Sequence, residues 1–244
     1  MTGLRAAFAF LTRLPVGRLD GSAAADLSAA APWFPVVGLA VGGISAGLRA
    51  AAGTVLPSAP STVIALAAAV LITGGLHEDG LADTADALGA HVDRARRLEI
   101  LRDPRLGTFG VLALGLVLLF SFAALAPLPA GRFARAAVVA HVLARCSPLL
   151  QSRLAPPARR DGSGSLLRAS NLALAIAFVI AAVVAIGIGK PGPGATALGI
   201  GALVTAGASY LARSAFGGTT GDTFGAGAKL VEVVSYGVFA AFWT

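Results

Sequence analysis

The chain has 244 residues, of which 56% are hydrophobic and only 13% charged. A soluble domain carries about 25% charged residues, so this composition and the mean hydropathy of +0.80 exclude an ordinary water-soluble domain. The formal net charge of +7 comes from basic residues spread thinly among apolar segments, and without a groove-reading motif this argues against nucleic acid binding. The single cysteine, Cys146, excludes an intramolecular disulfide and is expected to be a small buried residue.

The N-terminal segment, residues 1–30, contains a short apolar run from Ala6 to Leu11 that Arg13 and Pro15 interrupt. A signal peptide needs an apolar region of about 7–15 residues, so this run is too short. We therefore expect residues 1–30 to be retained as a cytoplasmic or interfacial segment.

Seven later segments are apolar enough to cross a bilayer, which takes about 20 helical residues with a range of about 17–25. They are Trp33–Arg49, Pro60–Leu76, Phe109–Ala126, Phe133–Leu150, Asn171–Gly189, Ala195–Ala212 and Ala228–Trp243. The fourth contains His141 and Arg145, so a six-span alternative, in which this segment is re-entrant or interfacial, stays open. His141 is expected to be a polar residue of the bundle interior. The sequence thus predicts an all-α, polytopic membrane helix bundle that forms one domain, residues 1–244.

Basic residues are divided unequally between the two sides that these spans define. Thirteen Lys and Arg residues fall on one side, in 1–30, 77–108 and 151–170 and at Arg213, against four on the other side. Cytoplasmic loops carry the excess of positive charge. We therefore expect a multi-pass protein of the bacterial inner (plasma) membrane with a cytoplasmic N-terminus, and with Thr244 outside.

Glycines recur at Gly38, Gly42 and Gly43 and again at Gly199 and Gly201. Small residues at such spacing let membrane helices approach closely. The pattern predicts close helix packing and not a binding site.

Acidic residues are concentrated in one short stretch, because seven of the twelve lie between positions 78 and 103. Asp79, Asp83 and Asp86 are spaced i, i+4, i+7 and therefore project from one face of a helix. Clustered carboxylates suit Mg²⁺, or Mn²⁺ as a substitute, with water and substrate phosphates completing the coordination. The predicted metal ligands are Glu78, Asp79, Asp83, Asp86 and Asp222. The predicted catalytic residues are Asp79, Asp83, Asp86 and His77.

A metal held between carboxylates and a diphosphate favours phosphoryl transfer, since it offsets developing charge while a spare carboxylate accepts a proton. Residues 77–108 then form the catalytic loop and helix on the cytoplasmic face. The alternative is a solvated juxtamembrane helix whose acidic residues pair with nearby arginines. That alternative accounts for Asp93 and Glu99, but not for residues 78–86, which include no basic residue.

Two further polar segments fall on the same predicted side. In residues 102–110, Pro and Gly break the helix before a span, and two arginines can bind phosphate oxygens. In residues 217–227, which we predict to be a loop, glycines let backbone N–H groups approach an anion closely. The candidate substrate-binding residues are Arg102, Asp103, Arg105, Gly107, Thr108, Gly218, Thr220, Gly221 and Thr223.

The sequence resembles the cobalamin synthase family of adenosylcobinamide-GDP ribazoletransferases over nearly its whole length. The motifs that carry the resemblance are residues 10–15, 33–38, 75–86, 102–110 and 220–226. The resemblance implies a magnesium-dependent membrane transferase that joins adenosylcobinamide-GDP to α-ribazole, or to its 5′-phosphate, and releases GMP. This is a late step in assembly of the coenzyme B12 nucleotide loop. By analogy, the ribazole 3′-hydroxyl attacks the phosphate attached to cobinamide.

The expected partners are these two substrates and the lipid bilayer, while a homo-oligomer or an association with other cobalamin-assembly enzymes stays open. One alternative function is a membrane alcohol phosphotransferase of the CDP-alcohol type, although its signature has Arg where Asp83 follows Ala82 here. The other is a cation-coupled transporter. Transporters place their acidic residues near the bilayer midplane, whereas these cluster at one side.

Overall fold

The computed structural model describes residues 2–16, 23–159, 163–167 and 169–243. Within these ranges the chain is helical and has no β-strand, which confirms the predicted all-α class. Thr244 and parts of the predicted segments 1–30 and 151–170 lie outside the described residues.

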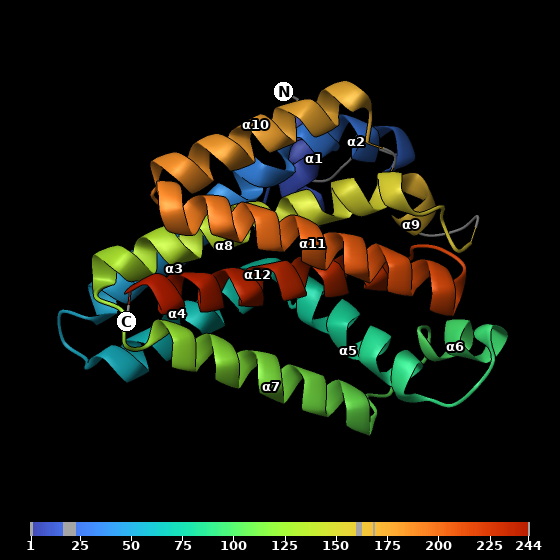
Figure 1. Cartoon of the computed structure of the whole chain (residues 1–244), viewed down its shortest axis with the longest axis horizontal. Coiled ribbons are helices and arrows are strands. Elements are labelled where there is room, and N and C mark those ends of the chain that lie inside the picture. The colour runs from blue at the N-terminus through green and yellow to red at the C-terminus, as the bar shows by residue number, and fades with distance from the viewer. Residues whose placement is uncertain (1, 17–22, 160–162, 168, 244) are drawn as a thin grey trace.

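The helices follow one another in the order shown in Figure 1. They are α1 (Thr2–Leu11), α2 (Ala23–Ala30), the 3₁₀ helix η1 (Ala31–Trp33), α3 (Phe34–Ala52), α4 (Ser58–Thr73), α5 (Leu76–Gly89), α6 (Arg94–Ile100), α7 (Thr108–Leu125), α8 (Ala130–Leu154), α9 (Ser163–Leu166), α10 (Asn171–Gly187), α11 (Pro191–Phe216) and α12 (Gly221–Trp243). Each of the seven predicted spans therefore overlaps a helix, although Pro60–Leu76 runs beyond the end of α4 at Thr73.

Five helical stretches of the described chain are long and apolar enough to cross a membrane: Leu27–Ala52, Thr108–Leu125, Ala130–Leu154, Pro191–Phe216 and Gly221–Trp243. A sixth is obtained if α4 and α5, which meet at 85°, count as one broken span. The seventh predicted span, α10, is an apolar helix of 17 residues. The protein is thus a multi-pass membrane protein, and α8 is one of its long helices instead of the re-entrant segment left open by the sequence.

Helix α8 forms the centre of the bundle. Figure 1 shows it beside α11 and α12, with α7 and α10 on opposite flanks. Close packing comes from Gly38 and Gly42 on α3, where an added Cβ would lie within 2.8 Å of the α8 backbone at Val142 and Val138. This confirms the role predicted for these glycines, whereas Gly199 faces open space. Cys146 is buried, as predicted.

The connecting segments meet at two opposite ends of the bundle. At one end, the Arg94 Nε donates to the carbonyl of Phe216 at 2.7 Å, which joins α6 to the end of α11. At the other end, the Arg135 guanidinium donates to the carbonyl of Ile188 at 3.0 Å, beside the start of α8. Arg94 and Arg135, which the sequence assigns to different sides, thus lie at opposite ends of the bundle.

Helix α4 ends at a pair of glycines. Gly74 and Gly75 both have left-handed backbone conformations, with φ values of 66° and 70°, and their N–H groups bond to the carbonyls of Leu71 and Val70. Glycine adopts this conformation without steric cost and so commonly ends a helix. The turn directs α5 away from the α4 axis, at an angle of 85°, and against α7 and α12.

Candidate active site

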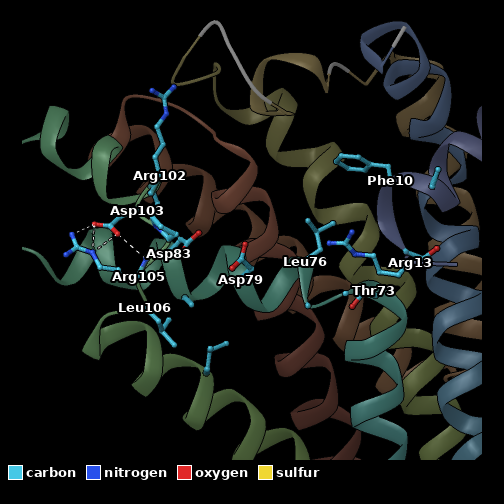
Figure 2. Close-up of a pocket in the computed structure, with 18 residues that line it drawn as sticks. Phe10, Arg13, Thr73, Leu76, Asp79, Asp83, Arg102, Asp103, Arg105 and Leu106 are labelled. Carbon is cyan, nitrogen blue, oxygen red and sulfur yellow. Dashed lines mark hydrogen bonds and ion pairs between the residues drawn. The ribbon is translucent and has the colours of Figure 1, made fainter. Parts of the chain in front are cut away.

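A polar cavity of about 840 Å³ opens at the end of the bundle that carries the basic segments. Three segments form its walls: the end of α1, the α4–α5 turn with one face of α5, and the loop between α6 and α7. Figure 2 shows Asp79 and Asp83 between Arg13 on one side and Arg105 on the other. The cavity therefore has acidic groups at its middle and a basic group towards each end.

Asp79 and Asp83 both line this cavity from α5. Neither carboxylate forms an ion pair or a hydrogen bond within the described residues. The pKa of Asp83 is raised to about 7, mainly because its carboxyl group is partly buried. The negative charges of Asp79, Asp222 and Asp86 raise it further. The site thus concentrates negative charge on α5, and among the described residues neither Asp79 nor Asp83 has an ion-pair partner.

Asp222 is brought near this pair by close packing of α5 on α12. A Cβ added to Gly80 would lie 2.7 Å from the carbonyl oxygen of Asp222 and 3.1 Å from the Cα of Gly225. The absence of side chains at both glycines lets the two helices approach closely. Asp222 itself accepts a hydrogen bond from the Thr220 hydroxyl at 3.2 Å.

Asp86, the third member of the predicted triad, has a different environment. Its two carboxylate oxygens accept hydrogen bonds from the backbone N–H groups of Gly107 at 2.7 Å and Gly110 at 2.8 Å. Asp86 therefore caps the first turn of α7, where free N–H groups and the helix dipole favour an anion. Within the described residues, no three acidic, His or Cys side chains converge closely enough to hold a metal ion on their own.

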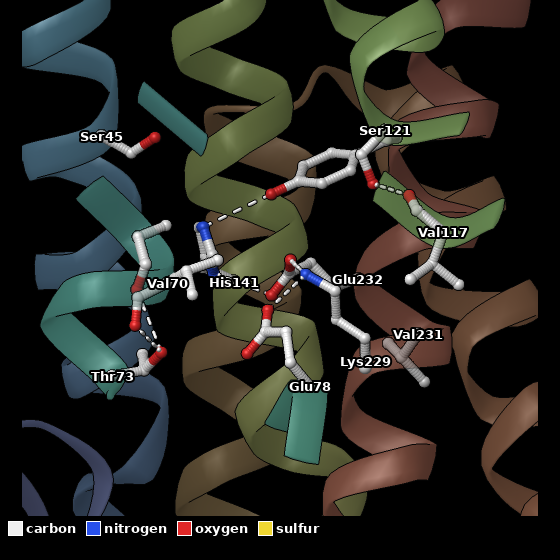
Figure 3. A network of polar contacts seen from close by, with 12 residues as sticks. Ser45, Val70, Thr73, Glu78, Val117, Ser121, His141, Lys229, Val231 and Glu232 are labelled. Atoms are coloured by element: carbon white, nitrogen blue, oxygen red, sulfur yellow. Dashed lines mark hydrogen bonds and ion pairs between the residues drawn. The ribbon is translucent and has the colours of Figure 1, made fainter. Parts of the chain in front are cut away.

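Glu78 and His77 point away from the cavity and into the bundle. Figure 3 shows the Glu78 carboxylate beside Lys229, with an Oε1 to Nζ distance of 2.8 Å, and Glu232 on the other side of the same ammonium group at 2.6 Å. His77 is only 3% exposed. The structure thus separates both residues from Asp79 and Asp83, with which they were predicted to act.

The buried polar cluster continues into α8. Glu232 also contacts Arg145 at 3.2 Å and His141 at 3.1 Å, and the ring of His141 lies 3.3 Å from the Tyr236 hydroxyl. The carboxylates of Glu78 and Glu232 face the cationic groups of Lys229 and Arg145, so the cluster as a whole is balanced in charge. His141 is a polar residue of the bundle interior, as predicted, and the cluster ties α5, α8 and α12 together.

The α6–α7 loop supplies two arginines of the cavity, Arg102 and Arg105. The Arg105 guanidinium pairs with the Asp103 carboxylate at 2.6 Å, and this hydrogen bonding lowers the pKa of Asp103 to about 2. Arg102 lies at the rim of the same cavity. The other two predicted residues of this segment, Gly107 and Thr108, begin α7 and do not line the cavity.

Outside the cavity, Asp93 caps α6 by accepting from the Arg96 N–H, and Glu99 pairs with the Arg96 side chain at 2.7 Å. Both are therefore surface charges, as the sequence indicated. No catalytic role is needed to explain them.

The expectation of a glycine-rich loop over residues 217–227 is wrong, because α12 already begins at Gly221. The Thr220 N–H donates to the Thr223 hydroxyl and the Thr223 N–H donates to the Thr220 hydroxyl, at 2.8 and 3.2 Å. This reciprocal pair caps the helix. Gly218 packs against the backbone of residues 156–158. Thr220, Gly221 and Thr223 therefore build the start of α12, and neither they nor Gly218 line the cavity.

Several residues that line the cavity were not predicted as site residues. They come from the end of α1 and the α4–α5 turn, and include Phe10, Thr12, Arg13, Thr73, Gly74 and Leu76. The available signal was the segment 10–15, which supported the family resemblance but had no assigned role.

These features define a polytopic membrane enzyme with an acidic, arginine-flanked cavity at one end of its helix bundle. The family model described as cobalamin-5-phosphate synthase matches residues 3–240. The chain belongs to this family and is a transferase of cobalamin biosynthesis.

Curated relatives carry the name adenosylcobinamide-GDP ribazoletransferase. The protein from Bradyrhizobium diazoefficiens is 41% identical over 98% of this chain and 93% of its own length. The proteins from Azorhizobium caulinodans and Leptothrix cholodnii are each 38% identical, over 93% and 97% of this chain and 91% and 94% of their own lengths. No solved structure shows a significant match. The family match favours the transferase over the transporter and over the CDP-alcohol enzyme.

Proposed function

We propose that this chain joins adenosylcobinamide-GDP to α-ribazole, or to α-ribazole 5′-phosphate, and releases GMP. The name of its relatives supports the substrates. The observation that carries the reaction type is the placement of Asp79 and Asp83, neither of which forms an ion pair among the described residues, on one wall of a polar cavity of about 840 Å³. A cavity of this size is large enough for the diphosphate-bearing part of the substrate.

The cavity also fits a divalent cation. Its available donors are the hard carboxylate oxygens of Asp79 and Asp83, with those of Asp222 close by, and burial together with the charges of the neighbouring aspartates raises the pKa of Asp83. Mg²⁺ binds through one or two carboxylates and completes its shell with water and substrate phosphates, so a fully preformed protein site is not required. When bound, Mg²⁺ or Mn²⁺ would offset charge that develops on the phosphates.

The residues of the chain would then act as follows. A ribazole hydroxyl oxygen forms a bond to the phosphorus attached to cobinamide, and the bond from that phosphorus to the bridging oxygen of GMP breaks. The hydroxyl proton passes to a carboxylate of the Asp79 and Asp83 pair. Asp86 holds the end of the loop that carries Arg102 and Arg105, two residues that line the cavity.

The same proposal includes the location of the protein. The segments richer in Lys and Arg surround the cavity end of the bundle, and positive segments stay on the cytoplasmic side of a bacterial inner membrane. The cavity would therefore open to the cytoplasm, where soluble substrates are available.

Purified protein in lipid nanodiscs tests the proposal directly. It is incubated with adenosylcobinamide-GDP, α-ribazole and Mg²⁺, and GMP and the joined product are quantified by chromatography and mass spectrometry. We expect equal amounts of both, dependent on both substrates and abolished by EDTA. GMP release without the joined product would show hydrolysis and would refute the proposed transfer.

A further inference from the structure

The end of α1 forms a fixed wall of the cavity. The Thr12 hydroxyl donates to the Phe8 carbonyl at 2.7 Å, and the Arg13 N–H donates to the carbonyl of Ile72, near the end of α4, at 2.7 Å. These bonds hold the Arg13 backbone beside the glycine turn that directs α5. Arg13 and Asp79 are thus positioned by two segments that are tied to each other.

The Arg13 side chain lies across Gly74. A Cβ added to Gly74 would be 2.7 Å from the Arg13 Cγ, so only glycine leaves room for this path. Figure 2 shows the guanidinium reaching Leu76, on the side of the cavity opposite Arg105, with Asp79 beyond Leu76. Arg13 is exposed, and within the described residues its guanidinium forms no hydrogen bond and no ion pair.

This arginine differs from the one at the opposite end of the cavity. Arg105 is already paired with Asp103 at 2.6 Å, whereas the Arg13 guanidinium has no partner among the described residues and lines the same cavity as Asp79 and Asp83. A guanidinium offers a planar set of donors that matches phosphate oxygens in a bidentate manner. A phosphate placed between Arg13 and a cation at Asp79 and Asp83 would be contacted by positive charge from both sides.

We infer that Arg13 binds a phosphate group of a substrate at the α1 wall of the cavity. The inference rests on the proposed function, which supplies two sources of this group: the diphosphate of adenosylcobinamide-GDP and the 5′-phosphate of α-ribazole 5′-phosphate. Arg13 is then a substrate-binding residue. If it binds the 5′-phosphate, it is also the residue that distinguishes α-ribazole 5′-phosphate from α-ribazole.

Two neutral variants test this role. Arg13→Met keeps an apolar stem over Gly74, and Arg13→Gln keeps polarity, while Arg13→Lys should restore part of the function because it restores the charge. The matched control is Arg96→Gln, which removes an exposed arginine whose partner, Glu99, also lies outside the cavity. Thermal unfolding in detergent identifies the folded variants, and the conclusion is drawn from whichever neutral variant folds.

The kinetic measurement uses both acceptors. If Arg13 binds the diphosphate, the neutral variants raise the KM for adenosylcobinamide-GDP about 10- to 100-fold with either acceptor, as expected for loss of a charged hydrogen bond. If it binds the acceptor phosphate, kcat/KM falls to a similar extent with α-ribazole 5′-phosphate only. Parameters within about twofold of wild type for all three substrates would overturn the inference.

Calorimetry separates this inference from the proposed function. Inorganic pyrophosphate and α-ribazole 5′-phosphate are titrated, with Mg²⁺, into wild type, the neutral variants and Arg96→Gln. Weaker binding of one of these probes by the Arg13 variants alone would support the role of Arg13 even if no turnover occurred. If a folded neutral variant binds both probes as tightly as wild type does, the inference about Arg13 is overturned.

Discussion

The carboxylate of Asp86 accepts the backbone N–H of Gly107 at 2.7 Å, across 21 residues of sequence. Its second oxygen accepts the N–H of Gly110 at 2.8 Å. An aspartate that belongs by spacing to a metal-binding triad is thus used to cap α7, and through this cap it fixes the loop that carries Arg102 and Arg105.

Asp86→Ala should therefore act mainly on stability and substrate affinity. Loss of a helix cap costs about 1 kcal/mol, so thermal unfolding should begin at a lower temperature than in wild type. The KM for adenosylcobinamide-GDP should rise because the arginine loop is released. An unchanged unfolding temperature together with complete loss of kcat would instead assign Asp86 to the chemistry.

Asp83→Asn and Asp79→Asn should weaken binding of a divalent cation without unfolding the protein. Each removes an uncompensated charge from the cavity wall, so Mn²⁺ affinity in the presence of inorganic pyrophosphate should fall at least about 10-fold. The Mn²⁺ affinity is measured from the electron paramagnetic resonance signal of free Mn²⁺. Glu99→Gln, an exposed neutralisation outside the cavity, is the control, and equal affinity in all four proteins would reject the proposed site.

The pair formed by Glu78 and Lys229 should be a determinant of stability. Lys229→Met leaves Glu78 and Glu232 buried beside fewer cations, and breaking a buried pair costs on the order of 3 kcal/mol. The double variant Lys229→Met with Glu78→Gln removes one charge of each sign and should recover part of that loss. A double-mutant cycle of unfolding free energies measures the coupling, and strictly additive effects would contradict the pairing.

The approach of α5 to α12 should tolerate no side chain at Gly80. Gly80→Ala places a Cβ 2.7 Å from the Asp222 carbonyl oxygen, so α5 must shift and Asp79 and Asp83 must move with it. We expect a lower unfolding temperature and reduced turnover. Gly115→Ala in α7, where no atom lies within 4 Å of the added Cβ, is the matched control. Equal turnover in both variants would show that the close approach is not needed.

The sequence predicted the helices well because apolar runs long enough to cross a bilayer have few other stable structures. It also predicted that Asp79 and Asp83 share a helix face. The role of Asp86 was not predictable in this way, since its partners lie in another helix and are backbone groups that no motif marks.

The structure differs from the sequence prediction at two further places, and in both the cause is again a contact between distant parts of the chain. Glu78 pairs with Lys229, which lies 151 positions later in the chain, so the local lack of basic residues gave no indication of an ion pair. Gly221 to Gly227 were interpreted as a loop because of their glycines, yet the Thr220 and Thr223 cap begins a helix whose glycine at position 225 packs on α5. In both cases a contact distant in sequence determines what the residue does.

The most direct test of the account is GMP release by Asp83→Asn in the reconstituted assay with adenosylcobinamide-GDP, α-ribazole and Mg²⁺. Wild type and Glu99→Gln should release GMP and form an equal amount of the joined product, whereas folded Asp83→Asn should be slower by at least about 100-fold. Turnover of Asp83→Asn at the wild-type rate would contradict the assignment of this cavity as the active site.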